Sequence, residues 1–275
     1  MHKNRDKQMK AGDEQLNKAV EDSLNRIKNK LMVMSGKGGV GKSTIAVNIA
    51  VALSEKGYKV GLMDIDFHGP NTLKMLNLEK EKILTDGKHI LPLKYSENLQ
   101  VISMAALLED PDTAIIWRGP LKIGVIKQFI ADVKWDNLDW LIIDSPPGTG
   151  DEPLTVAQII KNAKAIIVTT PQEISLMDVR KSINFCKNVN MPIIGIIENM
   201  SGFICPECGA HIEIFKSGGG KKTANEMNVE FLGSIPFEKN IMECADSGTP
   251  YFIQFKGAKT SNVFEKIIDK ILSKK

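Results

Sequence analysis

The chain has 275 residues, enough to bury a large core as one domain, and its charged side chains leave a net charge of only +3. It has no run of about 18 apolar residues. It also lacks an apolar N-terminal signal segment, so we expect a soluble, cytoplasmic protein that does not bind a membrane. Only two of its four cysteines are closely spaced, which argues against a disulfide framework.

The first 30 residues carry eight basic and five acidic side chains, which account for the whole net charge. The rest of the chain is balanced, which argues against a nucleic-acid-binding surface. Within this segment, residues 1–12 resemble a frayed tail, whereas apolar residues at helical spacing follow them: Leu16, Val20, Leu24 and Ile27. We therefore expect a charged, partly helical tail over residues 1–30 and a single α/β domain over residues 31–275.

Residues 36–43 read Gly-Lys-Gly-Gly-Val-Gly-Lys-Ser, the spacing of a phosphate-binding P-loop. An apolar run predicts a strand before it, and apolar residues at helical spacing predict a helix after it. Lys42 would reach the β- and γ-phosphate oxygens, and the Ser43 hydroxyl would bind Mg²⁺. The sequence thus predicts ATP contacts from Gly36, Lys37, Gly38, Gly39, Val40, Gly41, Lys42, Ser43 and Thr44.

Lys37 occupies a P-loop position that tolerates most residues. Lys42 already occupies the approach to the chain's own nucleotide. We therefore expect Lys37 to face the phosphates of a second subunit, as an arginine finger does in trans. The alternative interpretation is a solvated lysine on a loop.

Strands and helices alternate along the rest of the chain. Strands are predicted at 59–64, 99–104, 138–144, 165–169, 191–197 and 229–235, and helices at 123–133, 173–188 and 261–273. Such alternation predicts a mainly parallel sheet with helices on both faces, the three-layer sandwich of P-loop NTPases. Ligands bind these sheets at the carboxyl ends of the strands.

Three aspartates stand at predicted strand ends. Asp144 would lie beside the P-loop, where a carboxylate can hold Mg²⁺ through water. Asp66 is the residue that we expect to position the attacking water, whereas Asp64 is better suited to cap a loop. His68 is expected to hydrogen-bond in the same loop rather than act as a general base. The predicted catalytic residues are therefore Lys37, Lys42 and Asp66.

Two residues at later strand ends suit the base of the nucleotide. Asn199 has the side-chain chemistry to hydrogen-bond the adenine edge, and Pro236, with Phe237 beside it, could pack on the ring face. The strand predicted at 191–197 and the strand predicted at 229–235 would bring these residues to the same edge of the sheet.

Cys205 and Cys208 form a Cys-x-x-Cys knuckle in an irregular stretch over residues 200–217, a geometry that directs two thiolates at one metal centre. Two ligands are half of a tetrahedral set, so the pair predicts a homodimer in which each chain supplies one pair. Lys37 independently predicts the same dimer. An iron–sulfur cluster, a zinc ion and a redox disulfide all remain compatible with the pair.

The chain resembles the Mrp/ApbC group of the MinD-like ATPases with a modified P-loop, from about residue 31 to residue 252. The resemblance is carried by the P-loop, the Asp64–Pro70 segment, Trp117-Arg118-Gly119-Pro120, the loop 144–151, Glu198-Asn199-Met200-Ser201, the cysteine knuckle and Gly218-Gly219-Gly220. It implies a slow ATPase whose homodimer bridges one [4Fe–4S] cluster through Cys205 and Cys208 of both chains. It also implies that apo iron–sulfur proteins accept the cluster.

Two departures from the wider group concern the N-terminus. The four-cysteine cluster of the eukaryotic scaffold branch is missing from residues 1–30, and thirty residues are too few for the extra domain of many bacterial relatives. The resemblance therefore predicts the minimal form, with one cluster site.

A MinD- or ParA-like positioning ATPase is the alternative from another functional class. It depends on apolar residues at helical spacing near the C-terminus, flanked by lysines, which could lie on a membrane: Val263, Phe264, Ile267, Ile268, Ile271 and Leu272. The competing interpretation is a terminal helix packed on the core. A zinc-stabilised nucleotide switch is the other alternative, and it keeps the dimer.

Overall fold

The computed structural model describes residues 2–67, 69–107, 119–204, 208, 210–212 and 216–274. Four residues singled out from the sequence lie outside this part of the chain: His68, Trp117, Arg118 and Cys205. None of the helices within the described residues is long and apolar enough to cross a membrane.

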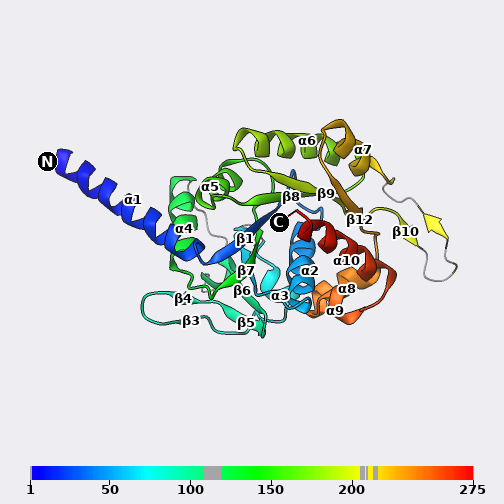
Figure 1. Ribbon diagram of the computed structural model, residues 1–275, viewed down its shortest axis with the longest axis horizontal. Helices are drawn as coiled ribbons and strands as arrows, with labels where there is room; N and C mark the ends of the chain where they lie inside the picture. The colour runs from blue at the N-terminus through cyan, green and yellow to red at the C-terminus, as the bar shows by residue number, and fades with distance from the viewer. Residues whose placement is uncertain are drawn as a thin grey trace.

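An eight-stranded sheet forms the centre of the molecule, in the order β12-β9-β8-β1-β7-β2-β6-β5 (Figure 1). Neighbouring strands are parallel except for β5, which is antiparallel to β6. The strands are β1 (Ile27–Ser35), β2 (Val60–Asp64), β5 (Leu93–Ser96), β6 (Leu99–Ser103), β7 (Leu138–Asp144), β8 (Lys164–Thr169), β9 (Ile193–Glu198) and β12 (Phe231–Ser234). The predicted α/β architecture is therefore confirmed.

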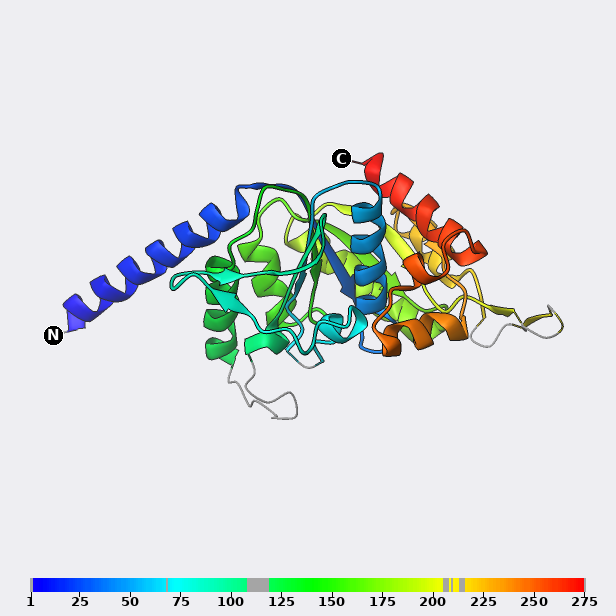
Figure 2. The same ribbon diagram turned by 90° about the horizontal axis from the view of Figure 1, so that it is seen from below.

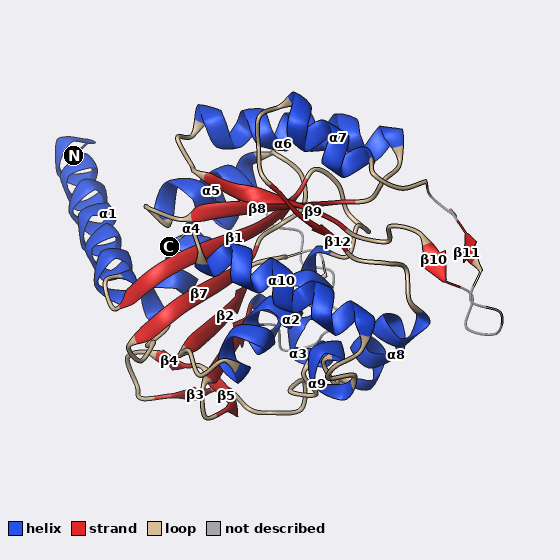
Figure 3. Cartoon of the chain, turned by 45° about the vertical axis from the view of Figure 1, so that its right-hand side comes forward, coloured by secondary structure: helices blue, strands red, loops and turns tan. Residues whose placement is uncertain are grey.

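Helices cover both faces of this sheet (Figures 1 and 3). One face carries α2 (Lys42–Glu55), α3 (Thr72–Met75), α8 (Lys239–Ser247), α9 (Tyr251–Gln254) and α10 (Lys259–Leu272). The other carries α1 (His2–Leu24), α4 (Gly119–Asp132), α5 (Asp151–Ile159), α6 (Glu173–Asn188) and α7 (Gly219–Glu226). A short 3-10 helix, η1 (Met104–Leu107), follows β6.

Strand β1 shows how the alternation of side chains divides the core into two layers. Leu31 and Val33 belong to the hydrophobic cluster that includes α2 and α10, whereas Met32 and Met34 belong to the cluster that includes α4 and α6. All four side chains are buried because β1 lies between β7 and β8, in the interior of the sheet.

Two small hairpins extend from the body. β3 (Leu84–Thr85) pairs with β4 (Ile90–Leu91), and β10 (Phe203–Ile204) pairs with β11 (His211–Ile212). The β10–β11 hairpin projects from the side of the molecule that carries β9 and β12 (Figure 3).

The N-terminal region differs from the sequence expectation. Helix α1 begins at His2, where a frayed tail was expected, and extends away from the body (Figure 2). Its C-terminal part packs on the domain through the buried Val20 and Leu24 and the partly buried Leu16. Strand β1 begins at Ile27, which pairs with Leu138, so the expected boundary between residues 30 and 31 falls inside the central sheet.

The C-terminal helix α10 packs on α2 and β12. Phe264, Ile267, Ile268 and Ile271 are all fully buried. The apolar stripe that could have served a membrane is thus part of the core of the folded chain.

Candidate nucleotide site

The P-loop connects the end of β1 at Ser35 to the start of α2 at Lys42. Gly39 and Gly41 have φ angles of 76° and 81°, a left-handed conformation that only glycine adopts without cost. Gly41 is the N-cap of α2, so the loop leads directly into the N-terminus of a helix. Backbone N–H groups at such a terminus, together with the helix dipole, favour a bound phosphate.

Close packing also requires glycine at two positions of this loop. A Cβ on Gly41 would lie 2.2 Å from the side-chain nitrogen of Asn199, and a Cβ on Gly36 would lie 2.6 Å from the backbone of Asp178. The loop is therefore held between the turn after β9 and the first turns of α6.

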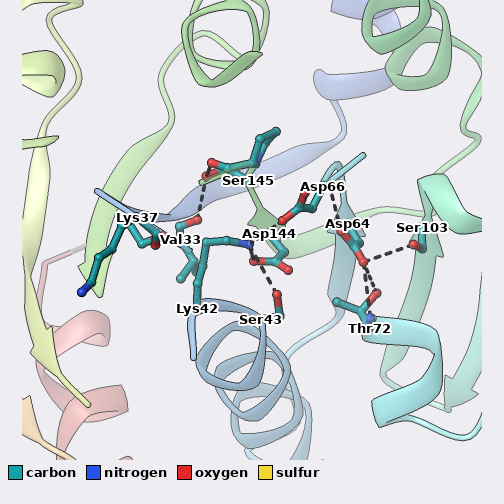
Figure 4. Close-up of polar contacts among 12 residues, drawn as sticks. Val33, Lys37, Lys42, Ser43, Asp64, Asp66, Thr72, Ser103, Asp144 and Ser145 are labelled. Atoms are coloured by element: carbon teal, nitrogen blue, oxygen red, sulfur yellow. Dashed lines mark hydrogen bonds and ion pairs between the residues drawn. The ribbon is translucent and has the colours of Figure 1, made fainter. Parts of the chain in front are cut away.

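Lys42 is the buried cation of the site, with 6% of the residue exposed. Its Nζ lies 2.5 Å from Oδ1 of Asp144 and 3.7 Å from Oδ2 of Asp66 (Figure 4). A buried ammonium without a nearby anion would be strongly unfavourable, so these carboxylates compensate its charge. A triphosphate entering the loop would compete with them for the same ammonium.

Asp144 ends β7 and is fully buried, and burial raises the pKa of its carboxyl group. Its Oδ1 accepts from Lys42, whereas its Oδ2 has no hydrogen-bond partner among the described residues. A buried acceptor of this kind is unusual and suits a water molecule from the hydration shell of Mg²⁺. The residues present therefore fit a magnesium–nucleotide complex.

Asp64 is the last residue of β2 and Asp66 follows two residues later, yet their surroundings differ. Asp64 is fully buried and accepts hydrogen bonds from the backbone N–H of Asp66, from the N–H and hydroxyl of Thr72, and from the hydroxyl of Ser103. Burial and repulsion from Asp144 raise the pKa of Asp64 to about 7. Asp64 therefore organises the loop, and Asp66 is the carboxylate that faces Lys42 (Figure 4).

Lys37 lies on the P-loop but is not directed at the same anions as Lys42. Its backbone carbonyl accepts a hydrogen bond of 2.8 Å from the Ser35 hydroxyl, which fixes the main chain. Its ammonium points away from the pair formed by Lys42 and Asp144 (Figure 4).

The two residues expected at adenine lie at the same edge of the sheet. The side-chain nitrogen of Asn199 donates to the carbonyl oxygen of Val40 at 2.9 Å, so an adenine contact would fall to the side-chain oxygen. Pro236 lines a cavity of about 300 Å³ with Phe203, Phe237 and Tyr251 among its other walls. Glu238, Lys239 and Lys259 also line this cavity, whereas Asn199 and the P-loop residues are not among its walls.

Three of the four cysteines lie among the described residues. Cys208 is exposed, in the connection between β10 and β11, whereas Cys186 and Cys244 are buried. Burial raises the pKa of the Cys186 thiol to about 12 and also raises the pKa of Cys244. Cys208 is therefore the accessible thiol of the three.

Sequence reasoning missed the role of Glu198, which is fully buried at the end of β9. Its carboxylate accepts hydrogen bonds from Ser201, Gly218 and Gly220, and so joins the residues on either side of the cysteine segment, residues 202–217. A lone glutamate at the end of an apolar strand was the available signal. Nothing local indicated its partners, which lie up to 22 residues away.

The parallel sheet, the P-loop and the carboxylates at neighbouring strand ends define a P-loop NTPase. Within this class, the chain belongs to the ParA-type family described as the NUBPL iron-transfer P-loop NTPases, whose model matches residues 26–272. The family relationship predicted from the sequence is confirmed.

Named relatives are similar over almost the whole chain. An iron–sulfur cluster carrier protein of Methanocaldococcus jannaschii is 48% identical, over 93% of this chain and 88% of that protein. A cytosolic Fe–S cluster assembly factor, the NUBP2 homologue of Dictyostelium discoideum, is 47% identical, over 90% of this chain and 95% of that protein. The relatives are thus carriers and assembly factors for iron–sulfur clusters.

Solved structures share the fold. The nucleotide-binding protein of Archaeoglobus fulgidus, in complex with ADP, has a TM-score of 0.75 and 35% identity, over 89% of this chain and 98% of that one. The cell-division ATPase MinD of Pyrococcus furiosus has a TM-score of 0.65 and 23% identity, over 90% and 99% of the two chains. The likeness to MinD concerns the fold alone.

Proposed function

We propose that this protein is an ATP-hydrolysing carrier that holds a [4Fe–4S] cluster between two copies of the chain and delivers it to apo-proteins. The observation that carries this proposal is the combination of a built P-loop with an exposed Cys208 in one chain. The relatives that are iron–sulfur cluster carriers and assembly factors support cluster delivery, and the ADP complex of the Archaeoglobus fulgidus protein supports nucleotide binding.

The chain's own residues suggest how ATP would be held. Lys42 would exchange its carboxylate partners for the β- and γ-phosphate oxygens, guided by the N–H groups of the loop. Asp144, released from Lys42, would accept from the water shell of Mg²⁺, which Ser43 would bind directly. Asp66 lies 3.7 Å from the Lys42 ammonium and would orient the attacking water near the γ-phosphate.

A second subunit would complete the active site. The ammonium of Lys37 points away from its own P-loop cluster, as a residue acting on the phosphates of a facing subunit would do (Figure 4). A positive charge supplied in trans stabilises the charge that develops during phosphoryl transfer. Hydrolysis would then depend on dimer formation.

The same dimer would complete the metal site. Cys205 and Cys208 supply two thiolates per chain, and a four-iron cluster takes four. Two pairs related by a two-fold axis satisfy the cluster at an interface, where a competing thiol from an apo-protein can reach it. The cluster is the cargo of this reaction, and the ATPase cycle would control its release.

Anaerobic reconstitution with iron and sulfide tests the proposal. We expect about four iron and four sulfide per dimer, with a broad brown absorbance. Cys205→Ala and Cys208→Ala should each abolish it, while Cys186→Ala and Cys244→Ala serve as matched controls in buried positions. Recovery of one tightly held zinc per dimer, without iron uptake, would favour the zinc-stabilised switch instead.

A further inference from the structure

Glu198 hydrogen-bonds the residues on both sides of the segment that carries the cysteine pair. Its Oε1 accepts from the hydroxyl of Ser201 at 2.5 Å and from the backbone N–H of Gly218 at 2.9 Å, and its Oε2 accepts from the N–H of Gly220 at 2.5 Å. Ser201 precedes the cysteine segment, and the two glycines follow it. One buried carboxylate therefore binds both ends of this segment.

The groups around Glu198 stabilise a negatively charged carboxylate. A Cβ on Gly220 would lie 3.0 Å from Oε2 and 3.1 Å from Cβ of Glu198, so the start of α7 packs tightly against this side chain. Gly218 is the N-cap of α7, and a negative charge at a helix N-terminus is favourable. Charge-assisted hydrogen bonds to backbone N–H groups are also stronger than neutral ones. The base of the segment is thus held firmly to the end of β9.

The next residue, Asn199, binds the P-loop instead. Its side-chain nitrogen donates to the carbonyl oxygen of Val40 and lies against Gly41. The Cε atom of Met200 lies 3.8 Å from the position of a Cβ on Gly41, so this side chain covers the same glycine. Met200 has a φ of 57°, which reverses the chain between the P-loop contact and Ser201.

We propose that Glu198 and Asn199 are positioning residues that couple nucleotide binding at the P-loop to the reactivity of the cysteine segment. The inference rests on the proposed function, because it takes this segment as the cluster-holding one. In this coupling, phosphate bound by the N–H groups of the P-loop would act on the main chain at Val40, whose carbonyl oxygen accepts the hydrogen bond from Asn199. Asn199 is bonded covalently to Glu198, and Glu198 holds both ends of the segment.

This connection is short and continuous: it consists of two hydrogen-bonded side chains and the peptide bond between them. It is also reciprocal: if ATP changes the state of the cysteines by some factor, occupation of the cysteines changes the affinity for ATP by the same factor. Residues 199–202, which connect the end of β9 to the start of β10, are the element that both sites would bias.

The test compares the alkylation rate of Cys208 by iodoacetamide with and without a non-hydrolysable ATP analogue, in the full chain without cluster. Couplings between sites are typically at least about fivefold, so we expect the nucleotide to change this rate by at least about fivefold in the wild type. Glu198→Gln keeps the shape of the side chain but turns an NH₂ group toward backbone N–H donors. In this variant the ratio of the two rates should fall to about one, with nucleotide affinity within about threefold of wild type.

Two further variants complete the experiment. Ser201→Ala removes a single hydrogen bond to Glu198 and should give an intermediate ratio, which guards against misfolding of the glutamine variant. Glu226→Gln is the matched control, because Glu226 lies on the same helix α7 but pairs with Arg180 at the surface. Its ratio should equal that of the wild type. All samples are compared at a concentration where chromatography gives the same association state.

A purely structural role for Glu198 would change both alkylation rates together and leave their ratio intact. An unchanged ratio in Glu198→Gln and Ser201→Ala, or no nucleotide effect in the wild type, overturns the coupling. Failure of iron uptake is a separate result, and it would argue against the carrier function alone. The coupling would still be supported if the nucleotide changes the alkylation rate of Cys208 in the wild type and not in Glu198→Gln.

Discussion

At the residue scale, the two P-loop lysines have opposite surroundings. Lys42 is buried between Asp144 and Asp66, whereas the ammonium of Lys37 points away from that pair (Figure 4). Both residues carry the same charge and lie five positions apart in the sequence. Their different directions make them separable by mutation, although each is a lysine in the same loop.

Lys42→Ala should abolish ATP binding, because it removes the main positive charge that faces the β- and γ-phosphates. Lys37→Ala should leave the affinity within a few-fold and remove turnover, because its charge acts on a facing subunit. Calorimetry gives the two affinities, and phosphate release gives the turnover. Equal weakening of nucleotide binding in both variants would show that Lys37 acts on its own nucleotide.

Asp66→Ala should retain Mg²⁺-ATP and hydrolyse it slowly. The residue contacts no phosphate in the proposed site, so its loss disturbs the position of the attacking water and lowers the single-turnover rate on the order of 10²-fold. Asp64→Ala is the informative comparison, because Asp64 accepts hydrogen bonds from Thr72 and Ser103. That variant should lose stability as well. A single-turnover rate of Asp66→Ala equal to wild type would exclude the proposed role.

At the element scale, the apolar residues of the C-terminal helix α10 could either bind a membrane or pack on the core, and a substitution can distinguish the two. Ile268 is fully buried against the domain. Ile268→Ala should therefore destabilise the protein by about 2–5 kcal/mol, through lost burial and the cavity that remains. Ile253→Ala, at a side chain that is 39% exposed, is the control and should have a much smaller effect. Urea denaturation measures both, and a loss below about 0.5 kcal/mol for Ile268→Ala would mean that α10 does not pack on the core in solution.

The sequence predicts the elements whose pattern is local. The P-loop and the strand-end aspartates follow from spacing within short windows, because each consists of neighbouring residues with one chemistry. The start of β1 was not predictable in the same way. Ile27 is in a strand because it pairs with Leu138, a partner 111 residues away that no local pattern reveals.

The candidate site shows the same limit. The side-chain chemistry of Asn199 alone predicted a contact with adenine. The structure shows a hydrogen bond from its side chain to Val40, 159 residues away in the sequence, which no local pattern indicated. Glu198 belongs to an apolar strand by pattern, yet its buried carboxylate depends on donors from Gly218 and Gly220. Such contacts arise from the way the chain folds back on itself, so they were found only in three dimensions.

At the scale of the whole molecule, the fold separates the three thiols among the described residues by their accessibility. Thiolate is the reactive form of cysteine, and burial both excludes the reagent and keeps the thiol protonated. The pKa of Cys186 is raised to about 12 and that of Cys244 is also raised, so both should react slowly near pH 8. Cys208 is exposed, and Cys205 belongs to the same knuckle.

Alkylation with iodoacetamide should therefore label Cys205 and Cys208 first in the folded chain, and all four thiols only after denaturation. Mass spectrometry of peptides at successive times measures the order. Reconstitution with iron and sulfide should protect the fast pair, because thiolates bound to a cluster are poor nucleophiles, and chelation of the iron should restore their reactivity. Protection of Cys186 or Cys244 by iron would place the cluster elsewhere. If Cys205 and Cys208 are still labelled fast after iron has bound, these thiols are not ligands of the iron.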